Sequence, residues 1–166
     1  MADPLYLTIR DDILTRLRAM SRANGYELDY GEVVFGVRMH GHADADYDRP
    51  DVGVRWLGEL LQDPISAGER ASHTTGRYPQ FEVSVPVRDD RTGDHEARAW
   101  KIQQDVEKAM LETNPVRTRG LTRCTTFPGQ PEWLDVDEAG ESEGGLLLDV
   151  FVVRFDHVTG DLSTEA

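Results

Sequence analysis

The stretch Leu146-Leu147-Leu148-Asp149-Val150-Phe151-Val152-Val153-Arg154-Phe155 decides the fold of this chain. Successive side chains of a β-strand point to opposite faces of a sheet, so the even and odd positions of this stretch lie on different faces. Both sets are mainly apolar, with Asp149 the exception on one face. A strand that is apolar on both faces is typical of the centre of a sheet that is covered on both sides. We therefore expect residues 146–155 to form a central strand.

Four other segments have the composition or the alternation of strands. They are residues 33–39, 52–56, 80–87 and 121–127. In the third segment apolar and polar side chains alternate, which indicates one buried face, and Pro86 favours an edge or a bulge. The sequence thus predicts about five strands.

Two segments have the periodicity of amphipathic helices. Apolar residues recur every three or four positions from Ile9 to Met20, with Thr8 placed as N-cap and Gly25 as the left-handed residue after the helix. A second apolar stripe runs through residues 97–111. Together these elements predict an α+β fold, with a mixed, mainly antiparallel β-sheet of about five strands and the two helices packed on one face.

The length of 166 residues is enough for one domain with a substantial core, so we expect a single domain over residues 1–166. Polar and Gly-rich segments predict three long loops, at residues 40–51, 57–78 and 128–145. Loops of this length in a small domain are usually functional, or become ordered on a partner.

The net charge of -13, with Asp and Glu spread along the chain, disfavours a DNA-wrapping role, because phosphate binding needs clustered Lys and Arg. Only Lys101 and Lys108 among the 18 basic residues are lysines. An acidic, lysine-poor composition is typical of proteins adapted to high salt, although a GC-rich genome explains the lysine shortage equally well. No segment approaches the roughly 20 apolar residues of a membrane span, and residues 1–4 do not begin a signal peptide. We expect a protein that is made in the cytoplasm and has no membrane partner.

The one local cluster that suggests metal chemistry is His40-Gly41-His42-Ala43-Asp44-Ala45-Asp46-Tyr47-Asp48. A calcium loop counted from Asp44 would need Gly and Glu where Arg49 and Arg55 stand, and the two histidines lack the spacing of a zinc site. The single cysteine, Cys124, has no catalytic signature around it, and no nucleophile elbow or phosphate-binding glycine motif occurs. The sequence therefore favours a solvated loop, and we expect no catalytic residues, no metal site and no cofactor.

Three tryptophans remain as candidate contact residues. Trp56 lies on a predicted strand and Trp100 at the edge of a helical stripe, so both are expected to pack internally. Leu60, Leu61 and Trp133 fall in predicted polar loops, where apolar side chains need a partner surface. We expect these three residues to anchor an interface.

The order of elements and three groups of short motifs resemble the tail terminator (tail completion) family of long-tailed bacteriophages and related archaeal viruses. The first group is residues 13–17 with 24–26 and 31–36, the second is residues 99–111 with 119–121 and Thr125, and the third is residues 153–155 with 159–162. In the third group Leu162 stands where a proline is often expected. The resemblance covers roughly residues 9–162.

The resemblance implies an assembly subunit of the virion tail rather than an enzyme. Such a subunit forms a sixfold ring that caps the tail tube, stops tube polymerisation and docks to the head connector. Its implied partners are further copies of itself, the tail tube protein and the connector or neck protein, and genome DNA passes through the ring without specific binding. The alternatives are a neck or head-completion adaptor, a small metal-dependent hydrolase using residues 40–48, and a monomeric ligand-binding module.

Overall fold

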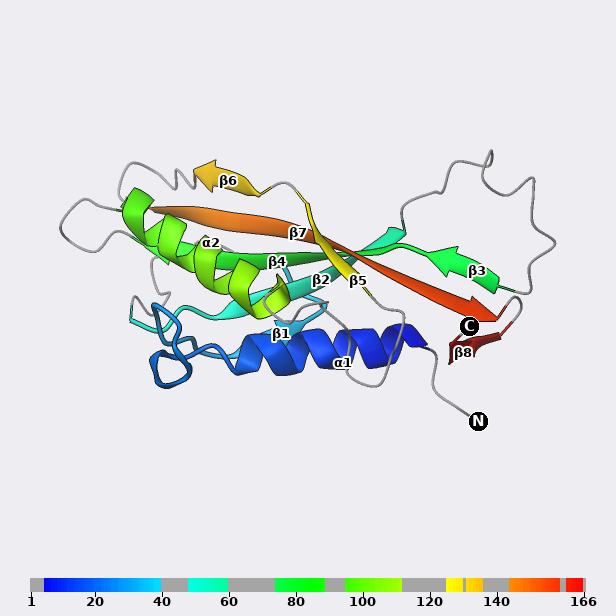
Figure 1. Cartoon of the computed structure of the whole chain (residues 1–166). Coiled ribbons are helices and arrows are strands. Elements are labelled where there is room, and N and C mark those ends of the chain that lie inside the picture. Colours follow the sequence, from blue (N-terminus) through cyan, green and yellow to red (C-terminus); the bar gives the residue numbers. More distant parts are fainter. Residues whose placement is uncertain are drawn as a thin grey trace.

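The structure is a computed structural model that describes residues 5–39, 48–59, 74–88, 95–111, 125–129, 131–135, 144–158 and 161–165. The bounds of its helices and strands are α1 Leu5–Arg18, β1 Val33–Phe35, β2 Val52–Glu59, β3 Thr74–Arg77, β4 Pro79–Arg88, α2 His95–Leu111, β5 Thr125–Pro128, β6 Glu132–Asp135, β7 Gly144–Val158 and β8 Asp161–Glu165. The strands form one mixed, mostly antiparallel sheet (Figure 1). This arrangement confirms the α+β class.

A long two-stranded ribbon forms the centre of the sheet. β7 is 15 residues long, about 50 Å at the usual rise of a strand, and it is antiparallel to β3 and β4 along one edge. Thr74 pairs with Val158 and Arg88 pairs with Gly144, in one unbroken register. Tyr78 therefore separates β3 from β4 without shifting the pairing.

β5 and β6 follow each other along the opposite edge of β7. Pro128 pairs with Phe151 and Glu132 pairs with Leu148, so the outer chain has one extra residue between these pairs. Gly129 lies in this irregular segment, where a Cβ atom would be 2.3 Å from a carbonyl oxygen of β7. Only glycine fits this close approach.

β2 extends the sheet beyond β4, and β1 lies parallel to β2 as the last strand on that side. The pairing of β2 with β4 shifts between Trp56 and Gly58, and Gly58 has a φ of 103°. β1 ends because Gly36 has a φ of 86°, and its N–H donates to the Val54 carbonyl at 2.7 Å.

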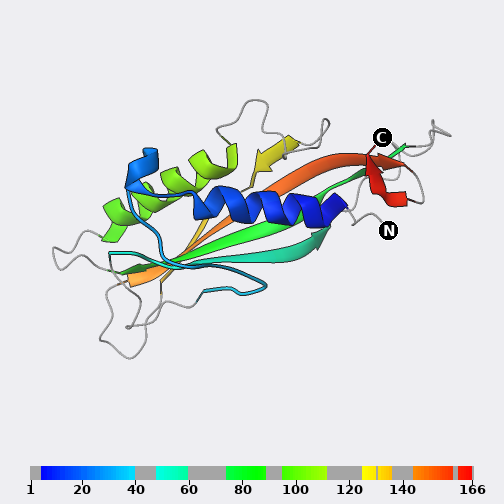
Figure 2. The ribbon, with the colours of Figure 1, turned by 90° about the horizontal axis from the view of Figure 1, so that it is seen from below.

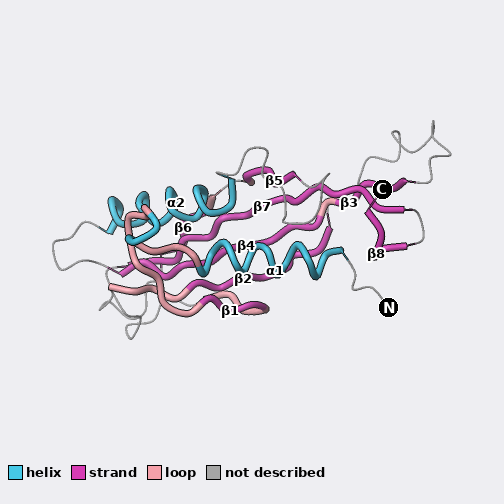
Figure 3. The backbone as a smooth tube through the Cα atoms, turned by 60° about the horizontal axis from the view of Figure 1, so that its bottom comes forward, coloured by secondary structure: helices cyan, strands magenta, loops and turns pink. Residues whose placement is uncertain are grey.

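Both helices cover the same face of the sheet, α1 over the β1–β2 side and α2 over the β7 side (Figures 2 and 3). The core lies between them and the odd-numbered residues of β4 and β7. Its fully buried side chains include Ile9, Leu17, Val54, Phe81, Val83, Val85, Ile102, Val106, Met110, Phe151 and Val153. This confirms that the two amphipathic helices pack on one face.

β7 is central in the sheet, as the sequence predicts. Leu146 and Leu148 are buried on the face away from the helices, while Phe151 and Val153 are buried beneath the helices. Toward the C-terminal end of β7 the face away from the helices becomes more exposed to solvent, and Arg154 on this face is exposed. The prediction of burial on both faces holds for the first half of the strand.

The long loops are shorter than predicted. β2 and β3 occupy the two ends of segment 57–78, and β6 lies inside segment 128–145. Pairing with a neighbouring strand supplies their backbone hydrogen bonds and overrides their polar, Gly-rich composition. Of segment 40–51, residues 40–47 lie outside the described residues.

Several element ends also differ from prediction. α1 begins at Leu5, so Thr8 lies inside the helix and is not its N-cap. Gly25 is left-handed as expected, with a φ of 83°, but it ends the short 3-10 helix Arg22–Asn24 rather than α1. β1 covers only part of segment 33–39, and β5 covers the described part of segment 121–127 and Pro128.

The described helices are neither long enough nor apolar enough to cross a membrane.

We expect Phe151→Ala to lower the free energy of unfolding by about 3–5 kcal/mol, because the ring is fully buried at the centre of the sheet and its removal leaves a cavity. Urea unfolding followed by circular dichroism measures this. Val152→Ala, at a half-buried position on the other face, is the matched control and should cost much less. Equal losses for the two variants would contradict the burial pattern.

Candidate functional site

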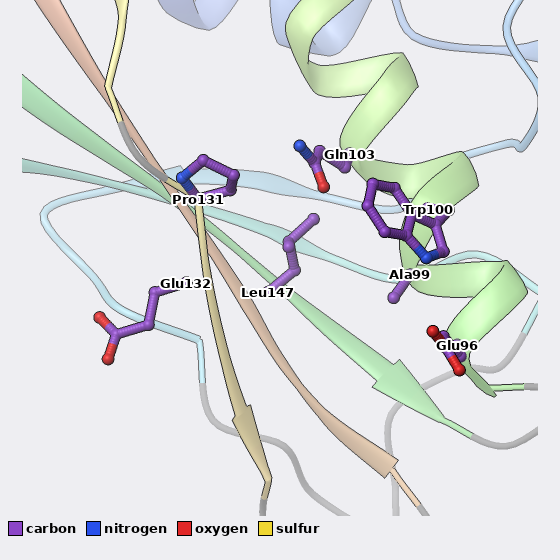
Figure 4. A pocket seen from close by; sticks show the side chains of 7 residues that line it. All are labelled: Glu96, Ala99, Trp100, Gln103, Pro131, Glu132 and Leu147. Carbon is purple, nitrogen blue, oxygen red and sulfur yellow. The ribbon is translucent and has the colours of Figure 1, made fainter.

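A groove of about 430 Å³ lies between α2 and the edge of the sheet formed by β6 and β7 (Figure 4). Its lining residues are Glu96, Ala99, Trp100, Gln103, Pro131, Glu132 and Leu147. This volume is within the range of about 300–1,000 Å³ that binding pockets commonly have. We call this site the α2–β6 groove.

The local sequence explains how the groove forms. The four α2 residues of the lining are spaced three and four positions apart, so they share one face of the helix. The irregular segment around Gly129 and Pro131 separates β5 from β6 and brings the chain to the groove opposite α2. Leu147, which is 4% exposed, lies between the helix and β6.

The chemistry of the α2–β6 groove is mainly apolar. The Trp100 indole is 63% exposed at its margin, while Ala99 and Leu147 supply aliphatic surface. Gln103 points toward the space beside Leu147, and the carboxylate of Glu132 points away from the helix (Figure 4). An exposed indole beside an apolar hollow is typical of a macromolecular contact, because aromatic anchors seated in pockets dominate binding energy.

A second exposed apolar surface lies at the other edge of the sheet, and we call it the β2-edge patch. Its residues are Tyr6, Phe35 and Trp56, which are 46%, 37% and 54% exposed, and Leu57, the next residue of β2, is 39% exposed. The Tyr6 and Trp56 rings stack with centroids 6.5 Å apart and planes 15° from parallel. The Arg10 guanidinium lies 5.6 Å from the centroid of the Phe35 ring.

These two surfaces lie far apart in the strand order. β1 and β2 are at one side of the sheet, whereas β6 pairs with the outer edge of β7 at the other side (Figure 3). β4 and β7 separate them. One copy of the chain therefore has two different apolar surfaces near opposite edges of the sheet.

Asp105 on α2 holds the chain that leads into β1. Its carboxylate accepts hydrogen bonds from the Glu27 N–H at 2.8 Å, the Leu28 N–H at 3.1 Å and the Tyr30 hydroxyl at 2.8 Å. Burial, together with the charge of Asp105, raises the pKa of the Tyr30 hydroxyl, which therefore stays protonated and donates. This fixes the start of the strand that carries Phe35.

Glu82 is buried on the sheet face away from the helices. Arg38 binds it with two guanidinium nitrogens, at 2.8 and 2.5 Å, and Arg55 approaches to 3.2 Å. Burial alone would raise the pKa of Glu82, but hydrogen bonds and charge from Arg38, with help from Arg55, hold this pKa below its ordinary value. The cluster ties the segment after β1 to the centre of the sheet.

Asp149 is the polar exception on the helix-covered face of β7, and it is 2% exposed. Its Oδ2 atom has no hydrogen-bond partner among the described residues. The pKa of Asp149 is raised to about 7, mainly by burial and in smaller part by the nearby charge of Glu107. A backbone hydrogen bond from Val150 opposes this shift. The carboxyl group is therefore largely protonated at mildly acidic pH.

The structure revises the predicted surroundings of the tryptophans and leaves the proposed contact role of Leu60, Leu61 and Trp133 a prediction. Leu60 and Leu61 lie outside the described residues. Trp133 lies in β6, in register with Leu147, and not in a loop. Trp56 and Trp100 were expected to pack internally, and this is wrong, because both are more than half exposed.

The predicted metal cluster lies almost wholly outside the described residues, which begin again at Asp48. Cys124 also lies outside them. The part of the chain that the structure describes contains no group of three or more His, Cys, Asp or Glu side chains placed to hold a metal ion.

The comparison with protein-family models gives no match, and neither does the comparison with curated proteins.

Replacing Asp105 by Asn should lower the free energy of unfolding by about 2–3 kcal/mol. The substitution removes the negative charge and one of the two acceptor oxygens to which the three donors bind. Tyr30→Phe removes only one of these hydrogen bonds and should cost about 1 kcal/mol. Urea unfolding of the two variants at neutral pH tests this order. A larger loss for the Tyr30 variant would contradict the role given to Asp105.

Asp149 should make the chain less stable as pH rises toward neutrality. A carboxyl group whose pKa is higher in the folded than in the unfolded chain takes up a proton on folding, so its stabilising contribution is lost between about pH 4 and about pH 7. From about pH 5.5 to about pH 8, we expect the parent to lose about 2 kcal/mol of unfolding free energy relative to Asp149→Asn.

Urea unfolding of both proteins across this pH range gives the difference directly. Glu107→Gln is the informative control, since it removes a charge that helps to raise the pKa of Asp149 and should shrink the loss. Parallel pH profiles for the parent and Asp149→Asn would show that Asp149 titrates at its ordinary pKa.

Proposed function

We propose that this chain is a structural virion protein, a tail terminator subunit that forms a ring on the end of the tail tube. In this role it stops tube polymerisation and offers a docking surface to the head connector. It acts by assembly rather than by catalysis and resides in the tail or neck region of the virion.

The observation that carries the proposal is the order of the elements in which the family motifs lie. Residues 13–17 belong to α1, residues 31–36 contain β1, and residues 99–111 belong to α2, with Thr125 opening β5. Residues 153–155 lie in β7. The described segments that carry the resemblance thus belong to the two helices and to the sheet that they cover, while residues 119–121 and 159–160 lie outside the described residues.

The two apolar surfaces favour a subunit that contacts other chains on two sides. A closed ring of identical subunits uses heterologous contacts, in which two different surfaces of each subunit meet those of its neighbours. The α2–β6 groove and the β2-edge patch are different in composition and lie at opposite sides of the sheet. This is the arrangement that such a ring requires.

The net charge affects both assembly and the passage of DNA. Subunits that each carry -13 repel one another at low ionic strength, and salt screens this repulsion. An excess of acidic side chains around the lumen would also repel the DNA backbone, so that DNA slides through without specific contacts. A ring structure with a basic lumen would refute this last part.

The first test is the mass of the protein across concentration, by light scattering coupled to size-exclusion chromatography, at about 0.01 M and about 1 M salt. The screening length falls from about 30 Å to about 3 Å between these conditions. We expect a species of six subunits, or reversible growth toward one, with assembly favoured at high salt. Assembly that weakens as salt rises would contradict an apolar contact between acidic subunits.

The second test is binding to tail tube polymers of the same virus. A terminator subunit should bind tube ends and stop further addition of tube protein, which sedimentation and electron microscopy can follow. Binding to the portal or connector without binding to tubes would instead identify a neck adaptor. A monomer that binds neither the tube nor the connector would contradict both assembly roles.

A further inference from the structure

The contact between α2 and β7 continues from the α2–β6 groove to the buried carboxyl group of Asp149. Leu147, which lines the groove, and Asp149 are two positions apart on β7, so both side chains lie on the face beneath the helices. Gln103, which also lines the groove, and Glu107 are four positions apart on one face of α2. The Gln103 Nε2 atom donates to the Glu107 carboxylate at 3.0 Å. This hydrogen bond links the groove to the acid whose charge acts on Asp149.

Among the described residues, the elements around Asp149 bring an acid to it and no cation. α2 contributes Glu107, and β4 contributes the apolar Val83, which pairs with Asp149. On the other edge of β7, β6 carries Glu132, but this carboxylate points away from α2 (Figure 4). The Oδ2 atom of Asp149 has no hydrogen-bond partner in the described part of the chain. An ionised Asp149 would therefore be a buried charge with no counterion, beside a second negative charge.

α2 is fixed to the rest of the chain on the side opposite Glu107. Asp105 lies two positions from Glu107, about 200° around the helix, and accepts a hydrogen bond from the Tyr30 hydroxyl at 2.8 Å. The Lys108 Nζ atom donates to the Gly25 carbonyl at 2.8 Å. The remaining Arg and Lys residues of α2 also lie off the Glu107 face, and they are Arg98 and Lys101. A small rotation of α2 about these contacts would part it from β7 on the side of Glu107.

We propose that a proton controls the contact between α2 and β7: α2 packs against Leu147 while Asp149 is protonated, and the contact opens to water from the groove when the proton leaves. Repulsion between the two carboxylates and the hydration of Asp149 favour the open form. The change falls near neutral pH, because the pKa of Asp149 is about 7. The proposal concerns a single subunit and does not depend on the proposed function.

Fluorine NMR of the chain labelled with fluorotryptophan tests the proposal, because Trp100 lines the groove and Trp56 lies at the other side of the sheet. Single Trp→Phe variants assign the signals. We expect the Trp100 signal to shift with a one-proton midpoint near pH 7, the pH at which the Asp149 carboxyl group titrates by carbon NMR. Its broadening by a neutral paramagnetic agent should increase over the same range, while the Trp56 signal stays unchanged.

Three variants separate Asp149 from other groups. Asp149→Asn keeps a neutral side chain of the same size, so the Trp100 transition should disappear and the closed form should persist. Glu107→Gln removes the repelling charge and should move the midpoint to lower pH. Glu96→Gln removes an equal charge from the groove margin and is the matched control, whose midpoint should stay that of the parent. Circular dichroism verifies each fold, and the half-buried Glu107 still provides a test if Asp149→Asn does not fold.

Two results would overturn the proposal. If Asp149 titrates and the Trp100 signal does not follow, protonation changes the stability of the fold without moving α2. If the Trp100 transition persists in Asp149→Asn, another group causes it, and its loss in His95→Gln would identify the first residue of α2 as that group. Neither result bears on the proposed function.

Discussion

The fold depends on the burial of β7, a strand that is apolar over both faces for half of its length. A backbone placed in such surroundings needs partners for its N–H and C=O groups on both edges. β3 and β4 supply them along one edge and β5 and β6 along the other. Both helices lie on one face of the sheet and share a single core with the odd positions of β4 and β7. The two sides of the sheet carry the exposed Phe35 and Trp56 on β1–β2 and the α2–β6 groove beside β6.

Three buried carboxylates are accommodated in three different ways, and each way has a structural consequence. Asp105 is satisfied by neutral donors and so fixes the chain before β1. Glu82 is satisfied by the cations Arg38 and Arg55, which tie the segment after β1 to the sheet. Asp149 has neither kind of partner for its Oδ2, so protonation is the cheapest way to keep it buried. The first two make β1 well anchored despite its three residues, and the third makes the central strand sensitive to pH.

The sequence contains strong signals for β7, α1 and α2. Each has a long and regular spacing of apolar residues, and this spacing matches either a helix or a strand but not both. β3 and β6 have no such signal, because four polar or mixed residues become a strand only through pairing with β7. The groove could not be predicted either. Its helix residues are spaced regularly, but its other side depends on the one-residue irregularity near Gly129. Trp56 continues the apolar alternation of β2, which predicts burial, yet in the structure it is 54% exposed and stacks on Tyr6 of α1.

The combination of strong acidity and exposed aromatic side chains suits the proposed role, in which free subunits stay apart before assembly. Electrostatic repulsion between identical chains acts over a Debye length, whereas apolar contacts act only when surfaces touch. At low ionic strength the net charge of -13 opposes the close approach of two copies, and at high ionic strength this repulsion shrinks to the range of direct contact. Salting-out ions also strengthen apolar burial. An apolar contact made by exposed side chains such as Trp56 or Trp100 would therefore be strongest where an acidic surface is best screened, and in the proposed ring the same charge would keep DNA free.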